Sequence, residues 1–334
     1  MKGNTAKSKK VSTMRRGSLE YWPHRRAQRQ MPRVRSWPSI AEQLPEGIVG
    51  VKVGMTHVAM IDNSEGPSKG SEIVRGATVV EIPKIYFYGI RLYDKGYAGY
   101  RKTSKDIYAK QQIGSLHFKE SKNAVESISN IKEELPKYSD LTALMFADLS
   151  TLHTGNKKIM RFEVGIGGKD IEEKFATAEK FFGKQVKVSD LFKGGELVDV
   201  TAITKGRGWA GVIKRYGVAR LARKATNKIR HVGTLGPWHP PKVLYTVPQA
   251  GHMGYNYRTE TNKRILKIGS ESESSAINVK GGFTNYGEVH GDYIIVEGSL
   301  PGVAKRIVRI RKALRSRAQP KDVQLTYVSL KSKG

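Results

Sequence analysis

Cysteine is absent from this chain of 334 residues, and aromatic residues make up only 8% of it. Without cysteine there is no disulfide framework, no thiolate zinc site and no cysteine nucleophile. Hydrophobic residues reach only 38%, which is low for a globular protein and indicates that part of the chain buries its surface against a partner. No run approaches the roughly 18 apolar residues of a membrane span. We therefore expect a soluble, cytosolic protein.

Acidic residues are missing from long stretches of the chain. Residues 200–258 carry 11 Lys and Arg, residues 301–321 carry 8, and neither segment contains Asp or Glu. Residues 1–35 carry 11 bases and a single acid, Glu20. These three segments account for the whole net charge of +29, because the other 219 residues hold equal numbers of bases and acids. The sequence predicts a neutral body with three basic segments.

The length of the acid-free segments indicates a polyanionic partner. A short basic run is usually a solvated face, but like charges over 59 residues oppose compaction unless a polyanion neutralises them. An anionic membrane surface would require helices with a continuous apolar face, whereas Gly and Pro interrupt these segments. The pattern therefore favours nucleic acid.

The apolar pattern predicts a mainly β protein with an α/β insertion. Short β-type runs separated by Gly, Pro and Asn favour an antiparallel sheet or small barrel over residues 47–94 and 185–334. Residues 95–184 form the predicted α/β insertion. They supply two helical patterns, from Ser121 to Leu135 and from Asp170 to Gly183.

Two segments lack both the helical and the strand period. Residues 1–46 form a basic arm in which Pro favours extended backbone. Residues 205–260 form a long basic finger in which Gly occurs eight times. So long an irregular stretch inside a domain indicates an extension that its partner orders. The composition of both segments predicts that they are unfolded when free.

Motifs for catalysis are weak. The Gly-rich run 165–169 lacks the spacing of a phosphate-binding loop and is better explained as the turn before a helix. His231, His239 and His252 have no Cys, Asp or Glu nearby to complete a metal shell. A metal-dependent nuclease needs clustered carboxylates, which the basic segments lack. We therefore predict binding without catalysis, no metal site and no cofactor, with any structural Mg²⁺ held by the RNA.

The finger combines bases with aromatic side chains. From Trp209 to Lys228, Lys or Arg recurs every few residues, with Tyr216 among them. Arg pairs with phosphate through two N–H groups and also stacks on bases, which suits folded RNA better than uniform duplex DNA. Trp238 lies among prolines where nothing predicts a core. It is either a loop Trp packed on its own domain or an aromatic held rigidly against RNA.

Several motifs resemble the universal ribosomal protein L3 family of the large subunit. They run in order from about Arg15 to Leu314, nearly the whole chain. Trp37-Pro38 and the Trp-His-Pro run at 238–240 resemble the archaeal and eukaryotic branch, and without the longer C-terminal tail of eukaryotic members the chain is similar to the archaeal type. The motifs are residues 50–57 (GVKVGMTH), 200–208 (VTAITKGRG), 214–218 (KRYGV), 233–240 (GTLGPWHP), 251–255 (GHMGY), 281–289 (GGFTNYGEV), 298–302 (GSLPG) and 305–306 (KR).

The resemblance implies both a fold and a function. It implies a six-stranded β-barrel of the translation-protein type with an inserted α/β domain, docked on large-subunit rRNA. It also implies that the arm and the finger enter the rRNA, with the finger tip at Pro237, Trp238 and His239 reaching toward the peptidyl-transferase centre. A role in large-subunit assembly follows from the same resemblance. The implied partners are large-subunit rRNA and neighbouring ribosomal proteins, without a membrane and without a second copy of the chain.

The residues that we expect to bind rRNA are bases and aromatics of the three basic segments. In the arm they are Arg15, Arg16, Trp22, Arg25, Arg26, Arg33, Arg35 and Trp37. In the finger they are Lys205, Arg207, Trp209, Lys214, Arg215, Arg220, Arg223, Lys224, Lys228, Arg230, His231, Trp238, His239, Lys242, His252, Tyr255 and Arg258. In the C-terminal segment they are Arg309, Arg311 and Arg315.

Two other classes of protein compete with a non-enzymatic rRNA scaffold in the cytoplasmic ribosome. An RNA-processing or RNA-modifying enzyme with a basic channel would need a carboxylate or His constellation facing that channel, which the sequence does not show. A free-standing DNA-compacting protein would prefer duplex DNA and would hardly need an acid-free finger with a proline-flanked Trp. The sequence therefore favours the scaffold.

Overall fold

A computed structural model describes residues 23, 25–34, 36–96, 101–109, 132, 134–152, 154–315 and 323–331. The chain divides into two compact units. The first contains residues 204–257 together with the described part of residues 1–28. The second contains residues 29–203 and 258–334 and carries the large hydrophobic core.

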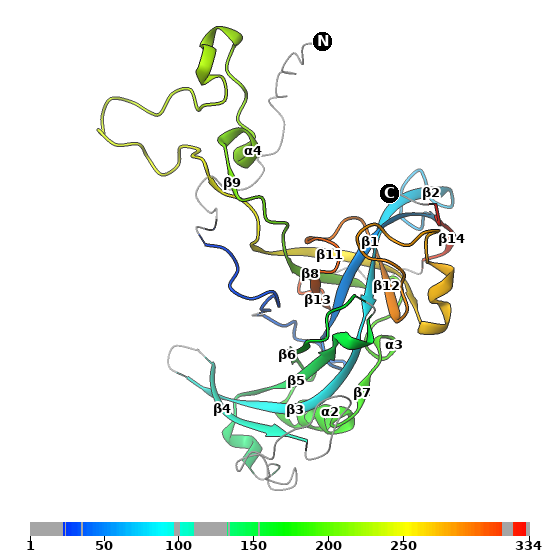
Figure 1. The fold of residues 1–334 in the computed structure, drawn as a ribbon. Coiled ribbons are helices and arrows are strands. Elements are labelled where there is room, and N and C mark those ends of the chain that lie inside the picture. Colours follow the sequence, from blue (N-terminus) through cyan, green and yellow to red (C-terminus); the bar gives the residue numbers. More distant parts are fainter. Residues whose placement is uncertain are drawn as a thin grey trace. The chain divides into compact units, whose positions relative to one another are not determined.

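The larger sheet of the second unit consists of β1 (Gly47–Ile61), β2 (Glu72–Ile82), β8 (Leu197–Ile203), β11 (Tyr257–Gly269), β12 (Asp292–Glu297), β13 (Ile307–Lys312) and β14 (Leu325–Val328). Its strand order is β13-β8-β11-β12-β2-β1-β14, and β13 also pairs with β1 (Figure 1). That additional pairing closes six of the strands into a ring, with β14 added beside the C-terminal part of β1.

β1 is long enough to pair with three neighbouring strands. Its N-terminal residues Gly47 to Val51 pair with β13, its C-terminal residues pair with β14, and β2 runs along most of its other edge. The strand is rich in Val and Ile, whose branched side chains fit a pleated surface, and Val49 and Val58 are fully buried in the core. The closed ring thus places residues 47–51 beside residues 307–311, which lie about 260 positions later in the sequence.

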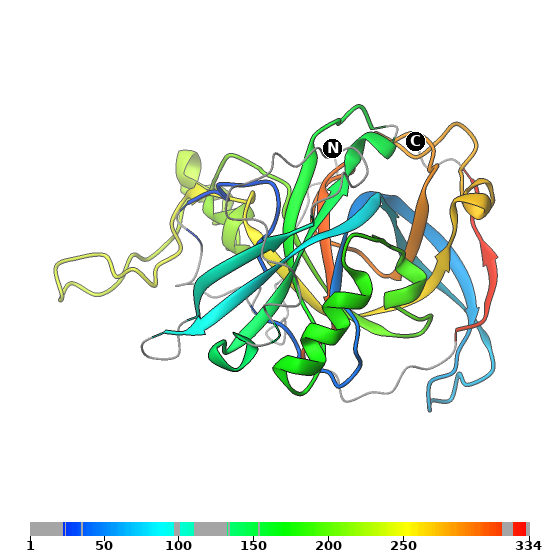
Figure 2. The same cartoon turned by 90° about the horizontal axis from the view of Figure 1, so that it is seen from below.

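A second sheet is built from β3 (Lys84–Lys95), β4 (Arg101–Tyr108), β5 (Asp140–Asp148), β6 (Ile159–Gly165) and β7 (Gln185–Val186). The order is β4-β3-β5-β6, and β7 pairs with the start of β3. Helix α2 (Ile171–Phe181), in green in Figure 2, packs on β5. Its buried side chains include Phe175 and Ala178. Shorter helical turns are η2 (Leu135–Lys137), η3 (Leu149–Thr151), α3 (Val188–Leu191) and η5 (Glu271–Ala276).

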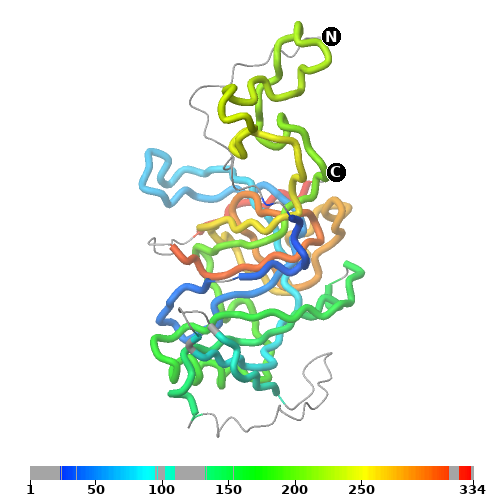
Figure 3. The backbone as a smooth tube through the Cα atoms, turned by 90° about the vertical axis from the view of Figure 1, so that its left-hand side faces the viewer, coloured from blue at the N-terminus to red at the C-terminus, as the bar shows by residue number. Residues whose placement is uncertain are grey.

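The β1–β2 hairpin extends beyond the ring, in light blue in Figure 3. Asp62 organises its turn: the carboxylate accepts hydrogen bonds from Ser68 Oγ at 2.6 Å and from the Ser64 N–H at 2.9 Å. These hydrogen bonds lower the pKa of Asp62 to about 2. The turn is therefore fixed by an ionised aspartate at neutral pH.

The mainly β fold class is confirmed, and so is the helix expected from Asp170, which occupies the N-cap position of α2 without a side-chain hydrogen bond to the helix. Gly183 follows the helix with a φ of +76°, as a helix-ending glycine does. The other expected helix, from Ser121 to Leu135, falls mostly outside the described residues. One difference concerns β3: it pairs with β4 and β5, so the second sheet begins at Lys84 and not at residue 95.

Candidate RNA interface

The two ends of the finger are joined by a backbone ladder. β9 (Trp209–Ala210) pairs antiparallel with β10 (Gly251–His252). The N–H of Met253 donates to Gly208 O and the N–H of Arg207 donates to Met253 O, both at 2.9 Å. Gly254 follows with a φ of +81°, and a Cβ there would lie 2.1 Å from the Lys205 carbonyl oxygen. The base of the finger thus has backbone structure of its own, which its composition did not predict.

Part of the arm lies along this ladder. The N–H of Ala27 donates to Tyr255 O at 2.8 Å, and Asn256 Nδ2 donates to Arg25 O at 3.0 Å. Asn256 is only 3% exposed, so its amide is committed to holding the arm. The exposed side chains of Arg25 and Arg26 therefore belong to the same basic unit as the finger.

A short helix follows β9. Helix α4 (Val212–Tyr216) ends at Gly217, which adopts a left-handed conformation with a φ of +72°. Arg215 Nη1 donates to Gln249 O at 2.8 Å, and its guanidinium lies 5.2 Å from the centre of the Tyr216 ring. Arg215 therefore ties the outgoing chain to the returning one, a role that the sequence analysis did not assign to it.

The bases of the finger are largely exposed and no acid lies among residues 200–258. Between α4 and the tip, the 3₁₀ turn η4 (Arg223–Lys228) carries three bases within six residues. The exposed members of the predicted set are Lys205, Arg207, Lys214, Arg220, Arg223, Lys224, Lys228, Arg230, His231, His239, Lys242 and Arg258. His252 and Tyr255 are half-buried at the ladder. The structure thus places most of the predicted set on one solvent-facing extension.

Large apolar side chains of the finger are also exposed. Trp209 is 79% exposed at the ladder and Trp238 is 88% exposed at the tip, so neither packs on its own domain. Tyr245, at 76%, was not among the predicted residues. Leu235 and Val243 are each 49% exposed and were also missed. The sequence did contain a signal for these three residues. They lie among prolines in a segment without helical or strand periodicity, and apolar side chains in such a segment have no hydrophobic core to pack into.

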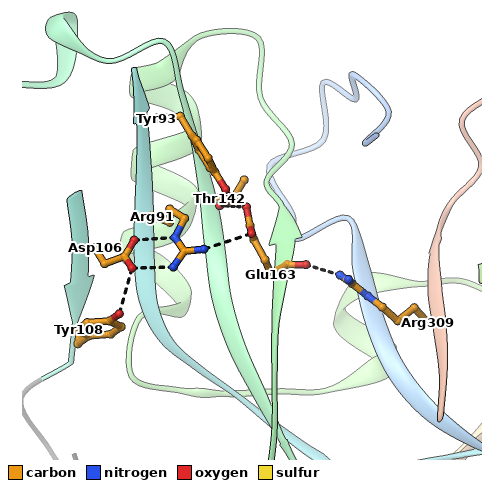
Figure 4. A network of polar contacts seen from close by, with 7 residues as sticks. All are labelled: Arg91, Tyr93, Asp106, Tyr108, Thr142, Glu163 and Arg309. Carbon is orange, nitrogen blue, oxygen red and sulfur yellow. Dashed lines mark hydrogen bonds and ion pairs between the residues drawn. The ribbon is translucent and has the colours of Figure 1, made fainter. Parts of the chain in front are cut away.

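Arg309 was predicted to bind rRNA, and the structure corrects this. It is 5% exposed on β13, donates to Pro32 O at 3.3 Å and to Glu163 O, and lies 5.5 Å from the Trp37 ring centre. Burial lowers the pKa of Arg309 to about 10, so it stays charged at neutral pH. The N–H donors of Arg309 are thus used inside the protein. Through Glu163, Arg309 belongs to a network of polar contacts that also contains Arg91 (Figure 4).

That network ties the second sheet to the ring. Arg91 pairs with Asp106 through two hydrogen bonds of 2.7 Å and lies 3.5 Å from the Glu163 carboxylate. The carboxylate also accepts a hydrogen bond from Tyr93, while the Glu163 carbonyl accepts from Arg309 on β13 (Figure 4). One glutamate therefore connects β3 and β4 with β13.

Arg311 is corrected in the same way, whereas Trp37 packs beside it and stays a prediction for RNA contact. Arg311 is 7% exposed, forms an ion pair of 2.9 Å with the buried Asp199, and donates to the Ser36 carbonyl. Trp37 is half-buried and packs against the core, where a Cβ on Gly165 would come within 2.6 Å of its ring. Arg311 and Trp37 thus hold the arm near Ser36 onto the body, and the Nη donors of Arg311 are directed at groups of the protein itself.

The remaining residues that were predicted to bind rRNA are either exposed or outside the described part of the chain. Arg33 and Arg315 are exposed and stay candidates for RNA contact. Arg15, Arg16, Trp22 and Arg35 lie outside the described residues.

Glu46 lies where the arm meets the second sheet. It is 3% exposed, and Oε2 has no hydrogen-bond partner among the described residues. It lines a cavity of about 160 Å³ together with Trp37, Asp140 and Lys174. Burial raises the pKa of Glu46 to about 7, against the opposing attraction of Lys174.

This raised pKa predicts a pH-dependent stability. Because the folded state holds the Glu46 proton up to about pH 7 and the unfolded chain releases it near 4.5, stability falls as pH rises between these values. At 1.36 kcal/mol per pKa unit, the loss is about 3 kcal/mol. Urea unfolding at pH 5 and pH 8 checks this: Glu46→Gln should remove the loss, whereas Glu65→Gln, at an exposed position, should keep it. Equal pH dependence in wild type and Glu46→Gln would contradict the assignment.

Two kinds of feature are absent from the part of the chain that the structure describes. Among the described residues, no group of three or more His, Asp or Glu side chains is placed to hold a metal ion. In the same part of the chain, no helix is both long and apolar enough to cross a membrane.

Comparison with known proteins agrees with the resemblance of the motifs. Residues 7–333 match the sequence model of the family described as ribosomal protein L3. A large ribosomal subunit protein uL3 of Methanothermobacter thermautotrophicus is 40% identical over 328 residues, which cover 96% of this chain and 97% of the relative. The uL3 proteins of Methanobrevibacter smithii and Thermoplasma acidophilum are 40% and 39% identical, each again over 96% of this chain and 97% of the relative.

Proposed function

Because the chain belongs to the ribosomal protein L3 family, we propose that it binds and braces the rRNA of the large ribosomal subunit and enters that subunit as it assembles. It is a ribosomal protein and not an enzyme. Its partners are large-subunit rRNA and neighbouring ribosomal proteins, and it acts as a single copy in the cytoplasmic ribosome. It needs no cofactor, and any structural Mg²⁺ is held by the rRNA.

One observation carries this proposal: the exposed, acid-free set of bases on the finger. Each Lys or Arg that meets a phosphate releases condensed counterions, and this release supplies much of the affinity for nucleic acid. Arg additionally stacks on bases. A surface of this kind neutralises phosphates where rRNA helices approach each other.

The finger is suited to enter folded RNA. Its two ends are fixed by the β9–β10 ladder, so the entry point of the finger is ordered before the RNA arrives and less ordering cost falls on binding. Beyond α4, the chain is irregular and rich in Gly and Pro, which lets its backbone approach phosphates closely. The arm residues held by Asn256 enter beside it.

The finger tip extends toward the peptidyl-transferase centre. Trp238 has no partner in its own domain, at 88% exposure, so Trp238→Ala should change the free energy of unfolding by less than about 0.5 kcal/mol. The variant should still co-migrate with the large subunit in a sucrose gradient of a native lysate. Ribosomes carrying it should be altered severalfold in tRNA accommodation or peptide transfer, because stacking of the indole on rRNA is lost.

Trp209→Ala is the matched control, since it removes an equally exposed indole at the ladder. It should weaken rRNA binding without altering peptide transfer. A free cytoplasmic pool of the chain with catalytic turnover would contradict the scaffold function. Normal tRNA binding and peptide transfer in Trp238→Ala ribosomes would contradict only the proposed position of the finger tip. The scaffold function would still stand.

A further inference from the structure

Three sequence motifs that the arm and finger do not use meet at one cavity in the second unit. Residues 52–55 of β1, residues 279–284 and residues 302–304 lie far apart in the sequence. Ten residues of these segments line a cavity of about 250 Å³: residues 52–55, 279, 282–284, 302 and 304. This volume corresponds to roughly eight water molecules, which is enough for one planar base and too little for a base pair.

The walls of this cavity are fixed by the protein itself. The N–H of Lys52 donates to Arg306 O and the N–H of Lys305 donates to Lys52 O, both at 2.9 Å. Lys52 Nζ donates to Leu300 O at 2.6 Å and lies 3.3 Å from Gly302 O. The cavity is therefore built before any ligand arrives, so binding carries little ordering cost.

Glycines leave part of the wall as bare backbone. Gly282 and Gly302 have φ values of +77° and +99°, which other residues rarely adopt. A Cβ on Gly54 would lie 2.9 Å from the Phe283 ring. The Phe283 ring therefore covers Gly54, and the absence of a Cβ at this position lets Phe283 and the backbone form this part of the wall together.

The side chains around the cavity combine apolar surface with positive charge. Phe283 and Met55 line it, and Met55 is 43% exposed. Lys52 also lines it, and its ammonium has three N–H donors, of which two face the carbonyls of Leu300 and Gly302. None of the ten lining residues is acidic, and Lys280 and Lys305, each next to a lining residue in the sequence, are exposed.

We propose that this cavity takes a single unpaired base of the rRNA, with the flanking phosphates on Lys280 and Lys305. The proposal rests on the rRNA-binding function proposed above. The apolar wall stacks on the base, the Lys52 ammonium donates to a carbonyl or ring nitrogen of the base, and the two lysines neutralise the backbone. An apolar side chain of another ribosomal protein would fit the volume, but it would leave these charges without a partner.

Filling the cavity tests the proposal. Ala304 lines it and is half-buried, so Ala304→Trp occupies the space while Ala304→Ser leaves it open. The full-length chain is bound to large-subunit rRNA, and base-specific chemical modification is mapped. Ala304→Trp should weaken binding about tenfold and lose protection at one unpaired nucleotide, while Ala304→Ser behaves as wild type. Identical protection with Ala304→Trp would overturn the proposal.

A second measurement does not depend on the folding of Ala304→Trp. The exposed Thr284 is replaced by a photoreactive benzoylphenylalanine in assembled large subunits. A crosslink to rRNA supports the base-binding site, whereas a crosslink to another ribosomal protein overturns it. If wild type binds rRNA but no protection depends on the cavity, this inference fails alone; if wild type does not bind rRNA, the proposed function fails.

Discussion

Replacing Arg311 with methionine is expected to lower the free energy of unfolding by about 3–5 kcal/mol. Arg311 is 7% exposed and its partner Asp199 is 1% exposed, with 2.9 Å between Nη2 and Oδ2. Methionine has a similar length but no charge, so it leaves the Asp199 carboxylate buried without its counter-ion. The arm also loses the hydrogen bonds that Arg311 donates to Ser36. Urea unfolding at neutral pH measures the loss.

Asp199 offers a test of this cause. Its carboxylate also accepts from the backbone N–H groups of Asn262 and Leu314, at 3.1 and 3.2 Å. Asp199→Asn in the Arg311→Met background removes the buried charge and keeps one acceptor oxygen, so it should restore part of the lost stability. Arg315→Met, at an exposed position, should cost less than about 0.5 kcal/mol. Equal losses at positions 311 and 315 would contradict the buried ion pair.

The second large effect concerns rRNA affinity. Arg223, Lys224 and Lys228 are exposed on η4, and replacing all three with Gln should weaken binding to large-subunit rRNA about 100-fold near 0.15 M salt. This follows from roughly a fivefold loss for each phosphate contact at that salt concentration. The slope of log affinity against log salt should become shallower by about 2–3. Filter binding of the full-length chain over a salt series gives both quantities.

The matched control removes the same charge from the neutral body. Lys69, Lys157 and Lys158 are exposed and lie outside the three basic segments. Replacing these three with Gln lowers the net charge equally, and it should change the affinity only a few-fold and leave the salt slope as it is. If both triple variants lose affinity alike, the finger makes no specific set of phosphate contacts and the chain binds through its total charge.

The sequence predicted those helices and strands for which the residues before, within and after the element all indicate the same structure. Helix α2 has an Asp before it, a Phe stripe on one face and Gly183 after it, and each signal points to the same helix. Strands β4, β5 and β6 were not predicted. In β5, residues 141–148 are all buried and only Thr142 and Asp148 among them are polar, so the run has no period that separates strand from helix.

The sequence predicted the exposed bases of the finger correctly, because their number alone prevents burial. It did not predict that bases of β13 are buried. The finger has too many like charges and too little apolar surface to bury them, so its bases are exposed as expected. In β13 all six residues are buried, including Arg309 and Arg311. Their donors are used by the carbonyls of residues 32, 36 and 163, which are brought to β13 only by the tertiary fold. A count of charges along the chain cannot distinguish these two situations.

Closure of the ring has a consequence for synthesis of the protein. The partner that completes β1 is β13, and it leaves the ribosome roughly 260 residues later, or some tens of seconds at about 5–20 residues per second. Until then one edge of β1 and one edge of β8 present unpaired backbone groups, which are templates for pairing with other chains. The nascent protein therefore passes through a long interval as an open, aggregation-prone sheet. At that stage the high positive charge of the nascent chain repels other copies of the same chain. The charge therefore protects the protein against aggregation while it is being synthesised.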